Sequence, residues 1–258
     1  MILQELADGR LWCINQTAHT QMSVELCRYW GNGDFAPLVA GGPTLLAVAQ
    51  HDNGWWEWEQ APELGADGTP LDFLNGPDWQ TRLGQWQRGI DRCFAQHPYA
   101  GVLTGAHAAA LYERYLVSVA VAPAENAALG AFIADQARLV REARRLLPGY
   151  HGLDDEALGA NTRMVQFGDL AALLVTVPWP SGHRIKVPTD ARGGVTEVTL
   201  TYDEAHICLD PWPYSQAGFT VSVWGRLLNE RRFDDDARYH QALAAAAPRW
   251  QEWRVSPA

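Results

Sequence analysis

Basic residues are scarce in this chain. Its 258 residues include 20 lysines and arginines against 30 aspartates and glutamates, which gives a formal net charge of −10. A protein that binds nucleic acid broadly needs basic stripes to neutralise phosphates, so this balance argues against a nucleic-acid partner. It does not exclude a small phosphorylated ligand, because a bound cation can supply positive charge locally.

Paired cysteines and long hydrophobic runs are also missing. The four cysteines include no C-x-x-C pair, which argues against a zinc knuckle or a thiol redox motif. The apolar run LAALLVTV (170–177) is far too short to span a bilayer, and MILQELADGR (1–10) lacks the apolar core of a signal peptide. We therefore expect a cytoplasmic protein with free thiols and no membrane partner.

Tryptophan, by contrast, is abundant. The chain has twelve, with clusters at 55–58, 79–86 and 212–224. An apolar fraction of 47% and a charged fraction of 19% indicate a well-packed globular protein rather than a disordered one. Tryptophan side chains fill such cores, and they also line pockets for flat ligands.

The periodicity of apolar residues predicts a mainly α fold. Helical periods occur at 15–30, 43–52, 79–96, 104–116, 124–147 and 154–176. Alternation with period two at 195–202 and 219–225 predicts strands. The alternation of residues 2–14 around an Asp8-Gly9 turn predicts a hairpin. We expect a helical body over 1–180 with an N-terminal β-hairpin, and a β-rich C-terminal addition over 181–258 that packs on this body and pairs with the hairpin.

Asp169 is the residue that most strongly suggests chemistry. It lies in MVQFGDLAALLVTV, within an apolar helix, where an ionised carboxylate costs several kcal/mol unless a partner or a metal compensates it. The alternatives are a helix face that is exposed at 169, or an ion pair with Arg163 or Arg114. A buried Asp169 predicts a charged partner.

A His-Asp dyad ends another apolar helix. His51 and Asp52 follow PTLLAVAQ, and His19 lies beside the apolar stripe of the preceding helix. Imidazole and carboxylate together suit iron, manganese, zinc and similar ions. A polar helix terminus is the alternative for the dyad alone, but with Asp169 the chain offers four candidate ligands on three helices.

This order of ligands resembles that of the HD-domain superfamily, which includes metal-dependent phosphohydrolases. Its members carry a first histidine, then a His-Asp dyad, then a distant aspartate, and the matching positions are His19, His51 with Asp52, and Asp169. The resemblance implies an HD-domain-like helical body. Many phosphodiesterase members continue the dyad as HD-x-G-K, whereas this chain has Trp55 in place of the lysine, which puts the usual phosphate contact in doubt.

Almost the whole chain also resembles an uncharacterised bacterial family of unknown function. The similar segments are HDNGWWEWE (51–59), PYAGVLTGAH (98–107), VQFGDLAALL (165–174) and DPWPY (210–214). No established activity accompanies this resemblance, so it implies a fold and a metal site rather than a reaction.

His107 is a candidate for a second metal or for substrate contact. Two-metal HD enzymes place one or two further histidines between the dyad and the last aspartate. Thr104 is a predicted N-cap, which would put His107 in the first turn of a helix, where backbone N–H groups also favour anions. A hydrogen-bonded core histidine is the alternative.

The aromatic residues after the dyad are expected to form the wall of a dry substrate pocket. This pocket would comprise Trp55, Trp56, Trp58 and Glu59, with Glu57 as an acid–base group or as a residue that orients a ligand. For each glutamate a structural or solvated role is the alternative.

Three functions remain open from the sequence. The first is hydrolysis of a small phosphorylated or related anionic substrate, with one or two divalent ions (Fe, Mn, Zn, Ni or Mg) and Asp52, His107 and Glu57 as catalytic groups. The second is a di-iron oxygenase, and the third is a non-catalytic protein that binds a small molecule in a tryptophan-rich pocket. The C-terminal addition could serve as a homodimer surface or as a lid.

Overall fold

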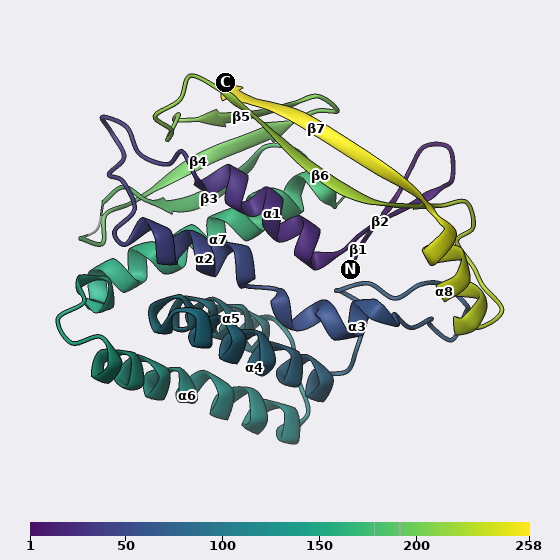
Figure 1. Ribbon diagram of the computed structural model, residues 1–258, viewed down its shortest axis with the longest axis horizontal. Coiled ribbons are helices and arrows are strands. Elements are labelled where there is room, and N and C mark those ends of the chain that lie inside the picture. The colour runs from purple at the N-terminus through teal and green to yellow at the C-terminus, as the bar shows by residue number, and fades with distance from the viewer. Residues whose placement is uncertain (178, 191) are drawn as a thin grey trace.

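The seven strands of the described residues form one curled, mixed sheet. The computed structural model describes residues 1–177, 179–190 and 192–258 (Figure 1). The strand order is β1-β2-β6-β7-β5-β4-β3, and β5 pairs with β7 in parallel while the other neighbours are antiparallel. The strands are β1 Ile2–Glu5, β2 Leu11–Ile14, β3 His183–Pro188, β4 Val195–Tyr202, β5 His206–Asp210, β6 Phe219–Leu228 and β7 Ala247–Pro257.

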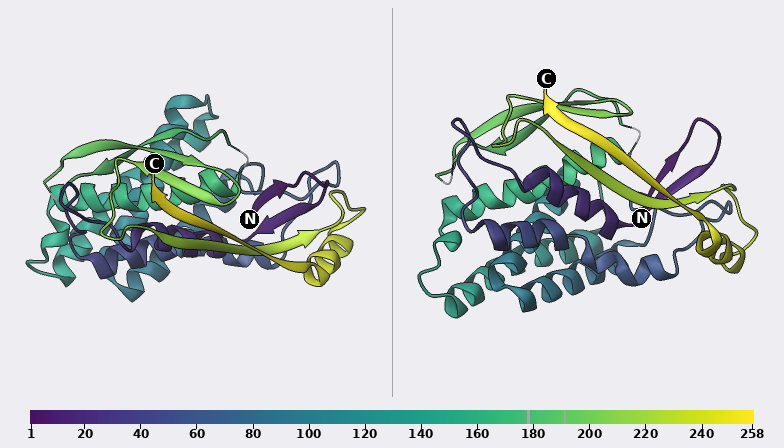
Figure 2. Two further views of the ribbon diagram at one scale, coloured as in Figure 1. Left: turned by 90° about the horizontal axis from the view of Figure 1, so that it is seen from above. Right: turned by 45° about the horizontal axis from the view of Figure 1, so that its top comes forward.

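Helices are stacked beneath one face of the sheet. α1 and α7 lie directly against it, followed by α2, α5 and α4, with α6 on the far side (Figures 1 and 2). No described helix is long and apolar enough to cross a membrane. The helices are α1 Gln16–Cys27, α2 Gly41–Gln50, α3 Trp56–Gln60, α4 Trp79–Gln96, α5 Pro98–Ser118, α6 Pro123–Leu146, α7 Asp155–Thr176 and α8 Asp236–Ala245, with single 3-10 turns η1 Asn53–Trp55 and η2 His151–Leu153.

The expected division of a mainly α fold into a helical body and a separate β-rich C-terminal addition is wrong, although helices do contain more of the described residues than strands. The N-terminal hairpin pairs through β2 with β6, so strands from both ends of the chain form a single sheet that covers the helices. The predicted pairing of hairpin and C-terminal region is confirmed, but the consequence is a mixed α and β architecture. β3 and β5 lie outside the predicted strands, although Ile185 and Val187 on β3, and Ile207 and Leu209 on β5, alternate with less buried residues. The pairing of β2 with β6 joins distant segments and leaves no local signal.

The side chains on one face of the sheet pack against α1 and α7. Along β6 the alternate residues Phe219, Val221 and Val223 are buried, and their neighbours Thr220 and Trp224 are exposed. This period of two matches one face that packs on the helices and one that meets solvent. A second, smaller core lies near α8 and contains Met1, Leu11, Cys13, Trp55, Trp58, Leu228, Phe233 and Tyr239.

Helix α5 begins earlier than the sequence predicts. Pro98 is its first residue, and the His97 ring accepts a hydrogen bond from the Tyr99 backbone N–H at 3.2 Å. Thr104 is therefore a buried residue inside the helix, whose hydroxyl lies 3.4 Å from Cys93 Sγ. The expected N-cap at Thr104 is wrong because proline fits the first helical position, and His107 lies well beyond the first turn.

Candidate metal centre

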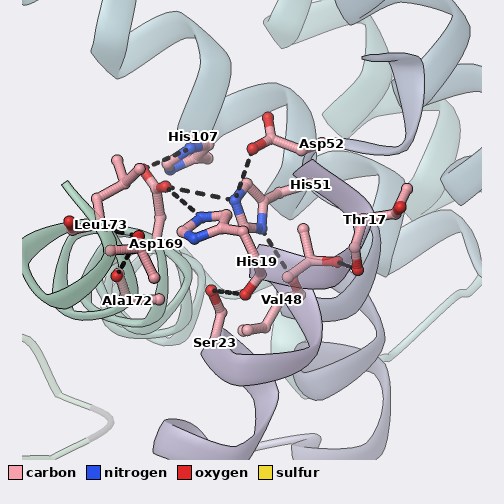
Figure 3. Close-up of polar contacts among 12 residues, drawn as sticks. Thr17, His19, Ser23, Val48, His51, Asp52, His107, Asp169, Ala172 and Leu173 are labelled. Atoms are coloured by element: carbon pink, nitrogen blue, oxygen red, sulfur yellow. Dashed lines mark hydrogen bonds and ion pairs between the residues drawn. The ribbon is translucent and has the colours of Figure 1, made fainter. Parts of the chain in front are cut away.

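Four buried side chains meet between the helices. His19 comes from α1, His51 and Asp52 follow the end of α2, and Asp169 comes from the middle of α7 (Figure 3). One donor atom from each lies within 4.8 Å of the other three. The structure thus brings together four residues that the sequence singled out, and this group could bind a metal ion.

A close approach behind the dyad fixes its position. A Cβ on Gly54 would lie 1.9 Å from the Gln85 carbonyl oxygen, and one on Gly89 would lie 3.0 Å from the Gly54 nitrogen. α4 therefore packs directly on the turn that follows Asp52. Only glycine at 54 leaves room for this backbone contact, which explains the spacing HD-x-G in physical terms.

The backbone orients the His51 ring. Its Nδ1 donates to the Val48 carbonyl oxygen at 2.8 Å, one turn back on α2. Its Nε2 then faces the carboxylates, at 3.4 Å from Asp52 Oδ2 and 3.5 Å from Asp169 Oδ1. Because one nitrogen of the neutral ring donates its proton to a carbonyl, the other nitrogen is unprotonated and can bind a ligand, as is common for metal-binding histidines.

His19 approaches the same carboxylate from the opposite helix. Its Nε2 lies 3.1 Å from Asp169 Oδ1, and its Nδ1 is buried with no hydrogen-bond partner among the described residues. α1 and α7 can pack this closely because a Cβ on Gly168 would lie only 2.8 Å from Cys27 Sγ. The small residue beside Asp169 therefore helps to set the distance between the two ligands.

The electrostatics of the cluster favour ionised carboxylate. Burial alone would raise the pKa of Asp169, but its hydrogen bonds with His19 and His51 and the nearby imidazoles hold the pKa well below its usual range. Burial likewise opposes the charged form of His51, yet Asp52 and Asp169 raise the pKa of that ring well above its ordinary value. An ion would therefore displace a proton on binding.

The donor set fits a divalent cation. Two imidazoles and two carboxylates suit zinc, iron or manganese, and neither Arg163 nor Arg114 forms an ion pair with Asp169 in the part of the chain that the structure describes. Donor atoms at about 2.1 Å from one ion lie at most about 4.2 Å apart. The cluster, which spans 4.8 Å, would need to contract by only about half an ångström.

His107 borders the cluster from α5. Its Nε2 lies 3.6 Å from Asp169 Oδ2, and its ring centroid is 5.2 Å from that of His51. Burial lowers the pKa of His107 to about 4, so the ring is neutral at neutral pH. Both ring nitrogens are buried and lack a hydrogen-bond partner among the described residues, so they are available to a ligand.

The structure places the predicted wall residues in other surroundings. Trp55 and Trp58 lie in the second core, while Trp56 is 48% exposed. Glu57 is an exposed partner of Arg92 and Arg88. Glu59 is buried, and its Oε1 accepts from the Met1 amine at 2.6 Å and from the Gln16 N–H at 2.7 Å. These partners give both glutamates structural contacts.

A different tryptophan stands beside the cluster. The half-buried Trp86 of α4 has its ring 5.9 Å from that of His107. Trp86 was not among the predicted site residues, because the sequence analysis predicts a helix over 79–96 without predicting which of its faces is buried. Trp86, Ile90 and Cys93 repeat at helical spacing, and this pattern would have marked the face that packs against α5.

Comparison with known protein families gives a match over most of the chain. No curated protein and no solved structure is detectably similar to this chain. Residues 1–230 match the family described as "Protein of unknown function (DUF3891)", which covers His19, His51, Asp52, His107 and Asp169. The chain therefore belongs to this family of unknown function.

Proposed function

We propose that the protein is a metal-dependent hydrolase of a small phosphorylated or related anionic substrate. The observation that carries the proposal is the convergence of His19, His51, Asp52 and Asp169 in a buried cluster. Burying two carboxylates side by side is costly without a cation, and no arginine or lysine is paired with either in the described part of the chain. A divalent ion would remove this cost.

The chain's own residues would divide the work. His19, His51, Asp52 and Asp169 would hold the ion, which when bound lowers the pKa of a coordinated water and polarises the bond to be cleaved. The neutral His107 can accept a hydrogen bond or a proton from a bound group. Trp86 beside it would exclude water from that side of the substrate.

The order of these ligands along the chain supports a relationship with the HD-domain superfamily. His19 lies on α1, the dyad directly follows α2 and Asp169 lies on α7, which is the order of ligands in that superfamily. The lysine of HD-x-G-K has no counterpart, because Trp55 at that position is part of the second core. A substrate phosphate would therefore need another cationic contact.

Metal analysis of Asp169→Asn tests the proposal. The amide keeps the shape of the side chain but removes its charge, so we expect the purified variant to retain less than a tenth of the wild-type metal content. Asp234→Asn, at an exposed position, is the matched control and should keep full metal content. Phosphatase and phosphodiesterase substrates would then be screened with both variants. A metal-free wild-type protein after incubation with Mn²⁺, Fe²⁺ and Zn²⁺ would contradict the proposal.

His107 keeps a second candidate function open. Its two unpartnered ring nitrogens next to Asp169 suit a second ion, and two irons would permit an oxygenase instead of a hydrolase. Iron bound at two equivalents per chain, together with oxygen consumption on addition of small alcohols or phosphonates, would favour the oxygenase. One ion per chain and phosphate release would favour the hydrolase.

A further inference from the structure

A positive side chain near the metal cluster would help to bind an anionic substrate, and most arginines in the region are already engaged. Arg82 donates to the carbonyl oxygens of Pro77 at 2.7 Å and Leu74 at 3.0 Å. Arg88 and Arg92 both pair with Glu57. The search for a substrate-binding arginine rests on the proposed function, since it concerns what the same site would bind.

Arg114 on α5 is uncommitted and suitably placed. It follows His107 by seven residues, which is two helical turns, or about 10.5 Å along the axis on the same face. Side chains on a helix lean toward its N-terminus, so Arg114 leans toward the turn that carries His107. Among the described residues it has neither an ion-pair partner within 4.0 Å nor a side-chain hydrogen bond, and it is exposed.

The His107 side chain also has polar atoms that a ligand could bind. The ring is 1% exposed and its two nitrogens lack partners among the described residues, so the side chain is buried with its polar atoms available. An unpartnered imidazole at the cluster and an uncommitted guanidinium two turns further along therefore lie on one face of α5, with Ala110 and Leu111 between them.

We propose that Arg114 is the specificity-determining residue that binds a phosphate group of the substrate while the reacting bond lies at His107 and the metal cluster. Guanidinium binds phosphate through two parallel charge-assisted hydrogen bonds, which a neutral substrate cannot form. Arg114 thus supplies the charge that the missing lysine would have provided. The substrate class is a phosphorylated small molecule rather than a neutral sugar or alcohol.

Binding of inorganic phosphate to the Mn²⁺-loaded protein tests this assignment. Titration calorimetry would compare the wild type with Arg114→Gln, Arg114→Lys and the control Arg141→Gln. Arg141 is an exposed arginine of α6 without an ion-pair partner among the described residues. We expect Arg114→Gln to weaken phosphate binding by about tenfold or more, Arg114→Lys to be intermediate, and Arg141→Gln to lie within about twofold of the wild type.

The Mn²⁺ content of each variant distinguishes failure of the Arg114 assignment from failure of the hydrolase proposal. All three arginine variants should bind Mn²⁺ as the wild type does, because none of them alters a ligand. If Mn²⁺ binds normally and Arg114→Gln binds phosphate as tightly as the wild type, the role of Arg114 is overturned and the hydrolase proposal stands. Absence of measurable phosphate binding in the Mn²⁺-loaded wild type also overturns it. Failure of the wild type to bind any metal overturns both.

Discussion

At the scale of single residues, the candidate site depends on contacts that its ligands make outside the cluster. The Val48 carbonyl sets the orientation of His51, and Gly168 allows α1 to bring His19 next to Asp169. Asp169 could be found from sequence because a carboxylate in an apolar helix is costly without a partner. Trp86 was not singled out among the tryptophans, although its helical spacing with Ile90 and Cys93 indicates the face of α4 that packs against α5.

Gly54 gives a residue-scale prediction about stability. An alanine there would place its Cβ 1.9 Å from the Gln85 carbonyl oxygen, so α4 would have to move away from the dyad. We expect Gly54→Ala to lower the free energy of unfolding by about 3 kcal/mol. Gly130→Ala is the control, because a Cβ there meets open space in α6 and should stabilise the helix by up to about 1 kcal/mol. Urea titration measures both, and equal midpoints would contradict the account.

His107 gives a prediction about pH. Burial lowers its pKa from 6.5 to about 4 in the folded protein. Between these values the unfolded chain binds a proton that the folded protein does not, so stability from this group is lost as the pH falls from about 6.5 toward 4.

The metal-free wild type should therefore lose more stability than His107→Gln when the pH is lowered from 7 to 5. The difference can reach about 1.4 kcal/mol for each pH unit inside the window. Urea unfolding of both proteins at several pH values measures it. If the stability of the wild type and of His107→Gln changed with pH in parallel, His107 would not be a neutral buried group.

At the scale of elements, the long helices were predictable and the sheet was only partly so. The expected helices at 124–147 and 154–176 correspond closely to α6 and α7, because each keeps an apolar period over many turns. α5 begins six residues before the expected Thr104, because Pro98 takes the first helical position and Thr104 lies inside the helix. β3 and β5 fall outside the predicted strands, although each alternates buried and more exposed residues over a short run.

The element that joins both ends of the chain gives a further prediction. Trp12 of β2 is 1% exposed, with Arg249 of β7 4.9 Å from its ring, so it links the hairpin to the C-terminal strands. Trp12→Ala should cost about 3–5 kcal/mol of stability. Trp250→Ala, at a position that is 65% exposed, should change it by less than about 1 kcal/mol.

At the scale of the whole molecule, the sheet and the ligand-bearing helices form one packed unit. α1 and α7 bury one face on the sheet and each presents a ligand to the cluster on the other side (Figures 1 and 3). Loss of the hairpin contact at Trp12 should therefore unfold the helices as well. Far-ultraviolet circular dichroism and tryptophan fluorescence should give the same midpoint for Trp12→Ala, and separate midpoints would indicate that the hairpin is independent of the body.

Anomalous X-ray scattering from crystals grown with Mn²⁺ or Zn²⁺ would show whether the four ligands bind a cation. We expect a strong peak among His19, His51, Asp52 and Asp169, with donor atoms at about 2.0–2.3 Å from it. The Asp169→Asn protein should lack this peak under the same conditions. A map of the wild type with no peak at these four side chains, at saturating metal, would contradict the account.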